Sequence, residues 1–116
     1  MKLFKVTFVL LVLLFSGWAA AHNRLLSTTP EEGGVAAPGS EISVSFNLET
    51  YLLDFDLLNP SGESVLGDYP LPMEASKTFA ITVPANAQSG EYTVHWKVEG
   101  ADTHQLEGSF TVLISQ

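Results

Sequence analysis

Cysteine is absent from this chain of 116 residues. No disulfide can therefore support the fold, and no thiolate is available to hold zinc or Cu(I). Methionine is nearly absent too, because Met73 is the only one besides the initiator. A soft thioether site for Cu(I) needs several methionines, so none is expected here. The fold has to rest on hydrophobic burial alone.

Basic residues are also scarce, with five Lys and Arg against 13 Asp and Glu and a formal net charge of −8. Such a surface repels nucleic acid and anionic lipid and attracts cations. Nucleic-acid binding is therefore excluded. The sequence contains no glycine-rich phosphate loop and no nucleophile placed to work with a His and an Asp, which argues against phosphoryl transfer and hydrolysis.

The one long apolar run lies at the N-terminus and is too short for a bilayer, which needs about 20 residues. Lys2 and Lys5 precede an apolar stretch over 6–15, and small residues lead up to Ala21. This pattern predicts a secretory signal over residues 1–21, cleaved after Ala21, rather than an uncleaved anchor. Residues 22–116 would then form one exported domain with a net charge of −10 and no stable membrane insertion.

The rest of the chain consists of short alternating or apolar runs separated by turn residues, a pattern typical of an all-β sandwich. The turn-rich segment 30–40 is interpreted as a connection. The count predicts a seven-stranded Greek-key β-sandwich of the immunoglobulin-like type. The expected strands cover residues 24–28, 41–46, 51–58, a weak one near 64–65, 79–83, 91–98 and 108–114.

The strand expected over 91–98 has the clearest alternation. Tyr92, Val94, Trp96 and Val98 face one way, and His95 faces the other. Tyr92 follows a turn at the start of this strand, which resembles a tyrosine corner, whose hydroxyl bonds back to the preceding connection. Trp96 is the expected central core aromatic. His95 is interpreted as an exposed or half-exposed sheet histidine rather than a ligand.

His22 is the first candidate for metal binding. Cleavage after Ala21 would expose a free α-amine on His22, and this amine and the Nδ1 of the same residue can close a six-membered chelate ring. Asp102 and His104 offer a carboxylate and a second imidazole in a D-x-H spacing. Three nitrogens and one oxygen are a donor set suited to Cu(II). The alternatives are an accidental terminal histidine and an ordinary polar turn, since a lone D-x-H is common.

Several motifs in a fixed order resemble the CopC-like periplasmic copper-binding proteins. The resemblance implies a sandwich of cupredoxin or immunoglobulin-like type with one surface Cu(II) per chain. Its implied ligands are the amine and Nδ1 of His22, a carboxylate oxygen of Asp102 and an imidazole nitrogen of His104. The matching pieces are Ala21-His22, the run from Leu25 to Gly33, Ala37-Pro38, the strand ending at Phe46, the run from Gly90 to Val98, Ala101-Asp102-Thr103-His104 and Gly108-Ser109-Phe110.

One departure from the family concerns the end of the strand at Phe46. Some members carry a glutamate there, whereas this chain has Leu48 at that place and Glu49 one residue later. A one-residue slip in a strand can reverse the direction of a side chain. Whether Glu49 adds a ligand therefore stays open.

The resulting interpretation is a monomeric periplasmic Cu(II) carrier or buffer, not an enzyme. It would pass copper to an inner-membrane copper transporter or to another cuproprotein. Two alternatives remain from other classes. One is a small copper redox enzyme of the histidine-chelate type, and the other is a metal-free immunoglobulin-like interaction domain.

Overall fold

The computed structural model describes residues 22–116, so the predicted signal lies outside the described residues. This part of the chain is all-β, and it contains no helix long and apolar enough to cross a membrane. Its strands are β1 (Leu25–Thr29), β2 (Gly34–Ala36), β3 (Glu41–Leu58), β4 (Ser76–Thr82), β5 (Gly90–Gly100) and β6 (Gln105–Ile114).

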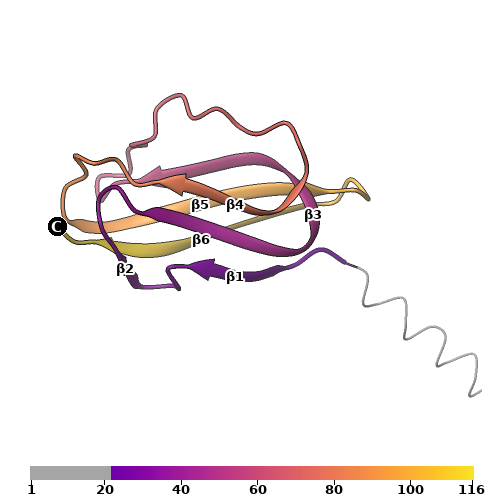
Figure 1. Cartoon of the computed structure of the whole chain (residues 1–116), viewed down its shortest axis with the longest axis horizontal. Coiled ribbons are helices and arrows are strands. Elements are labelled where there is room, and N and C mark those ends of the chain that lie inside the picture. Colours follow the sequence, from indigo (N-terminus) through magenta and orange to yellow (C-terminus); the bar gives the residue numbers. More distant parts are fainter. Residues whose placement is uncertain (1–21) are drawn as a thin grey trace, which may run out of the picture.

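The strands form two layers that share β3, so hydrogen bonding continues from one layer into the other (Figure 1). The first half of β3 pairs with β1 on one side and with β4 on the other. The second half pairs with β5, and β6 and β2 complete that layer. The all-β sandwich expected from the sequence is confirmed, in the form of one curled sheet.

Three strand assignments differ from those expected. The strands expected at 41–46 and 51–58 are the two halves of β3, which bends between the layers without leaving extended conformation. The segment near Ser64 and Val65 is not a strand, because Ser64 makes only an isolated bridge to Leu58. Instead, β2 lies inside the segment expected to be a connection and pairs in parallel with β6. With the halves of β3 counted separately, seven strand segments make up the layers.

The core lies between the two layers and follows the alternation of the sequence. The faces expected to be buried are buried in β3, β5 and β6, because every second side chain of a strand points to the same side. The large side chains that are fully buried include Phe46, Ile42, Leu57, Ile81, Ile114, Val44, Val94, Val98 and Val112.

Two aromatic residues of β5 have the structural roles expected of them. The Tyr92 hydroxyl donates a 2.8 Å hydrogen bond to the carbonyl of Gln88, as in a tyrosine corner. Trp96 is 6% exposed and packs edge-on against Phe46, with ring centroids 5.2 Å apart. Its indole also crosses over Gly108 on β6, where a Cβ would lie only 2.5 Å from the Trp96 ring.

The fold brings two distant parts of the chain to one end. The chain enters β1 at the end of the sandwich where the β5–β6 hairpin turns, opposite the C-terminus (Figure 1). This placement follows from the topology, because β1 runs antiparallel to the first half of β3, and the hairpin tip lies beside the bend of β3. Residues around 22 and around 102 can therefore meet.

Candidate metal centre

The β5–β6 hairpin is closed by a tight turn over Gly100–His104. The Gly100 N–H donates to the His104 carbonyl at 2.9 Å, and the Thr103 N–H donates to the Gly100 carbonyl at 3.0 Å. Thr103 has φ of 67°, a left-handed conformation that is unfavourable for a β-branched residue. Strain of this kind persists only where surrounding contacts enforce it, and it is common at functional sites.

Within this turn, Asp102 and His104 contact each other directly. Asp102 Oδ1 accepts the backbone N–H of His104 at 3.1 Å, and Oδ2 lies 3.0 Å from His104 Nδ1. The backbone N–H of His104, with smaller contributions from its imidazole, holds the pKa of the Asp102 carboxyl below its ordinary value. The carboxylate is therefore ionised at neutral pH.

This contact determines the tautomer of His104. An ionised carboxylate can only accept hydrogen bonds, so the proton between the two groups must sit on Nδ1 of the imidazole. In the neutral imidazole, Nε2 then keeps its lone pair free. An imidazole oriented by a carboxylate in this way is a recurring arrangement among metal-binding histidines. The side chain of His104 is 77% exposed, so Nε2 is open to an ion from solvent.

His22 is held beside this turn by its neighbours in the chain. Asn47, at the bend of β3, donates from Nδ2 to the His22 carbonyl at 2.8 Å. Asn23 packs against the backbone of Gly100, which leaves no room for a Cβ at that position. Neither asparagine could be recognised from the sequence, because a single Asn carries no recognisable motif.

The structure brings His22, Asp102 and His104 together. One ligand atom from each of them lies within 4.8 Å of those of the other two, and all three residues are exposed. A metal ion with bonds of about 2.0 Å spans about 4 Å between opposite ligands. Small side-chain rotations would therefore close the three donors around one ion. Among the described residues, no other group of three or more such side chains converges in this way.

Glu49 lies near this centre but outside the converging group. It lines an open groove together with Asp102, and Lys77 lines the same groove. The other lining residues are Asn23, Leu48 and Ala101. The sequence left open whether Glu49 adds a ligand, and in the described structure it contributes an exposed negative charge near the site.

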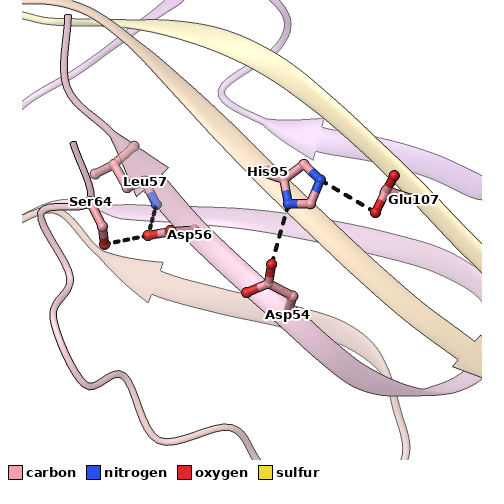
Figure 2. A network of polar contacts seen from close by, with 6 residues as sticks. All are labelled: Asp54, Asp56, Leu57, Ser64, His95 and Glu107. Atoms are coloured by element: carbon pink, nitrogen blue, oxygen red, sulfur yellow. Dashed lines mark hydrogen bonds and ion pairs between the residues drawn. The ribbon is translucent and has the colours of Figure 1, made fainter. Parts of the chain in front are cut away.

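His95 is separate from the candidate metal centre. As expected, it is half-exposed, with 34% of its side chain accessible, and it points away from the core. Its Nδ1 lies 3.4 Å from Asp54 and its Nε2 lies 3.6 Å from Glu107, so the two carboxylates flank the ring on opposite sides (Figure 2). One ion cannot use both ring nitrogens, and the arrangement is that of a polar outer sheet face.

Comparison with known proteins gives consistent matches. The CopC domain profile matches residues 25–114. Copper resistance protein C of Pseudomonas syringae pv. tomato is 32% identical over 108 residues, which cover 85% of each chain. The profile match begins after His22, so it does not include the first of the three converging residues.

Solved structures show the same fold at lower identity. CopC from Methylosinus trichosporium OB3b has a TM-score of 0.64 and 20% identity, covering 81% of this chain and 94% of its own. PcoC from Escherichia coli, described as a methionine-rich copper resistance protein, has a TM-score of 0.56 and 22% identity, covering 82% and 100%. These structures show that the fold is shared, whereas the profile and the curated relative show the family: the chain belongs to the CopC family of copper resistance proteins.

Proposed function

We propose that the processed protein begins at His22 and carries one Cu(II) ion in the periplasm. The observation that carries this proposal is the convergence of His22, Asp102 and His104 within 4.8 Å at one end of the sandwich. It agrees with the family to which the chain belongs and with the apolar leader that ends at Ala21. Processing would release the α-amine of His22 beside its own imidazole.

In this proposal each donor has a distinct role. The amine and Nδ1 of His22 would close a six-membered chelate ring, which an internal histidine cannot form. His104 would bind through Nε2, because its Nδ1 proton is directed at Asp102. The Asp102 carboxylate faces the Nδ1 side of that ring, so it would turn away from this hydrogen bond to offer an oxygen to the ion.

The donor set favours Cu(II) over the competing ions. Imidazole, amine and carboxylate are borderline or hard ligands, whereas Cu(I) prefers thiolates and thioethers. Met73 is the one methionine of residues 22–116, so this chain lacks the soft donors that a Cu(I) site needs. Against Zn(II) and Ni(II), Cu(II) is favoured by the Irving–Williams order and by its preference for tetragonal nitrogen and oxygen sites.

The exposure of the site favours a carrier over an enzyme. All three residues lie at the surface, so a partner's ligands can approach the ion and take it over by stepwise exchange. Suitable partners are an inner-membrane copper transporter or another cuproprotein. The abundance of acidic residues concentrates cations around the protein and speeds their capture.

The test is a titration of the processed protein with Cu(II) against a competing chelator. We expect binding at one ion per chain, strongly weakened in His104→Ala and unchanged in His95→Ala, which removes a histidine remote from the site. Sustained turnover of ascorbate and peroxide by the loaded protein would favour a redox enzyme instead. Absence of binding by the wild type would leave a metal-free interaction domain.

A further inference from the structure

Asn47 lies where the pairing between β1 and β3 ends. After a shift of register between Ser27 and Leu25, the pairing reaches Leu25 opposite Phe46, and the Asn47 N–H still donates to the Arg24 carbonyl at 3.2 Å. Beyond that point β3 bends toward the other layer, so its backbone can no longer pair with the residues that precede β1. Any further support for those residues has to come from a side chain.

The side chain of Asn47 supplies this support with both ends of its amide. Its Oδ1 accepts the Arg24 N–H at 2.7 Å, and its Nδ2 donates to the His22 carbonyl at 2.8 Å. These partners fix the orientation of the amide, because a backbone N–H needs an acceptor and a carbonyl needs a donor. The side chain thus acts as an additional peptide unit that pairs with residues 22 and 24.

We infer that Asn47 is a positioning residue for the copper site, which holds His22 in place and selects how it chelates. This inference rests on the proposed function. Terminal residues usually fray unless they are tied down, and a frayed His22 would have to be ordered each time an ion binds. Asn47 ties the backbone of His22 to β3 from one side, while Asn23 packs on Gly100 from the other.

The bond to the His22 carbonyl also affects the choice of donors. A free N-terminal residue can chelate a metal through its amine and its own carbonyl oxygen, which closes a five-membered ring. In this chain that carbonyl oxygen accepts the Nδ2 hydrogen of Asn47 and is turned toward β3. The amine is then left to pair with Nδ1 of the same residue. Asn47 therefore favours the nitrogen-rich chelate over the mixed nitrogen–oxygen one.

Two substitutions of Asn47 separate this role from simple electrostatics. Asn47→Ala removes both side-chain hydrogen bonds. Asn47→Asp keeps an acceptor for the Arg24 N–H but loses the donor to the His22 carbonyl, and it adds a negative charge near the site. Electrostatic attraction alone predicts tighter Cu(II) binding by Asn47→Asp, whereas positioning predicts weaker binding. Asn86→Ala, at an exposed asparagine between β4 and β5, is the matched control.

The experiment uses the protein exported through its own leader, with His22 verified as the N-terminus by mass spectrometry. In the metal-free protein, we expect amide exchange at Arg24 to accelerate about tenfold in Asn47→Ala and to stay unchanged in Asn86→Ala. Cu(II) affinity, measured by chelator competition, should fall about tenfold in both Asn47 variants, the lower end of the range for residues that orient metal ligands. The EPR spectrum of Asn47→Ala should show fewer nitrogen donors.

Unchanged Arg24 exchange and unchanged affinity in Asn47→Ala would overturn the inference, as would tighter binding by Asn47→Asp. These outcomes differ from failure of the proposed function. If the wild type itself bound no Cu(II), both the proposed copper site and the positioning role of Asn47 would be rejected. If wild type and variants bound Cu(II) equally tightly with the same EPR spectrum, only the positioning role of Asn47 would be rejected.

Discussion

The imidazole of His104 and the carboxylate of Asp102 face each other across a single residue, with Nδ1 3.0 Å from Oδ2. The carboxylate also accepts the backbone N–H of His104 at 3.1 Å. Asp102 therefore holds both the backbone N–H and the imidazole ring of His104. Because the tautomer follows from this pairing, the nitrogen that His104 presents to solvent is Nε2.

Asp102→Asn should weaken Cu(II) binding by about 10–100-fold, since it removes a charged donor and the acceptor that sets the His104 tautomer. The fold should persist, because Asp102 lies at the surface. Chelator competition measures the affinity, and circular dichroism checks the fold. Asp68→Asn, which removes an exposed charge outside the converging group, is the matched control. Equal loss in both variants would mean that Asp102 acts only through overall charge.

In the metal-free protein, NMR titration of the Asp102 carboxyl should give a midpoint below that of the same residue in urea. The first cause is the backbone N–H of His104, so His104→Ala should keep part of the lowering. A depressed pKa in the folded state stabilises the fold above the unfolded pKa, and this contribution is lost as pH falls through the folded pKa. A midpoint equal to that in urea would contradict the geometry of the turn.

Thr103→Gly should affect the free energy of unfolding and the Cu(II) affinity in different directions. Glycine adopts the observed φ of 67° without strain, so the free energy of unfolding should stay the same or rise by about 1 kcal/mol. Cu(II) affinity should fall several-fold, because the turn that aligns Asp102 with His104 becomes more mobile. Thr103→Asn, which tolerates the same conformation with less added freedom, should retain affinity. Chemical denaturation and chelator competition on one preparation test both parts.

Gly108→Ala should destabilise the fold by about 1–3 kcal/mol, a typical cost of overpacking. The added Cβ would lie 2.5 Å from the ring of Trp96, which is buried and cannot move aside freely. Ser109→Ala, at the next and exposed position of β6, should have little effect. Thermal unfolding measures both variants. A stability loss in Ser109→Ala equal to that in Gly108→Ala would show that contact between the added Cβ and Trp96 is not the cause of the loss.

The alternation of the sequence sufficed to predict which faces are buried, because burial in a strand follows a period of two. The tyrosine corner at Tyr92 and the core position of Trp96 could be predicted from the same local pattern, and both are confirmed. The convergence of His22 with the Asp102 turn could be anticipated too, since the order of strands puts both at one end. Their binding of copper stays a prediction.

What the sequence could not predict depends on contacts between distant segments. β2 is only three residues long, and its extended conformation comes from pairing with β6 near the end of the chain. The continuity of β3 through its bend likewise depends on different partners before and after it. Asn47 has no local signal, because its role exists only where β3 bends past the residues that precede β1.

The most direct test of the account compares two forms of residues 22–116 in a Cu(II) titration followed by EPR. One form has the free amine of His22, and the other carries a single Gly ahead of it. The account predicts tight one-to-one binding with a nitrogen-rich tetragonal spectrum for the first form, and lost or sharply weakened binding for the second. Equal binding by both forms would contradict it, because the His22 amine would then play no part in the site.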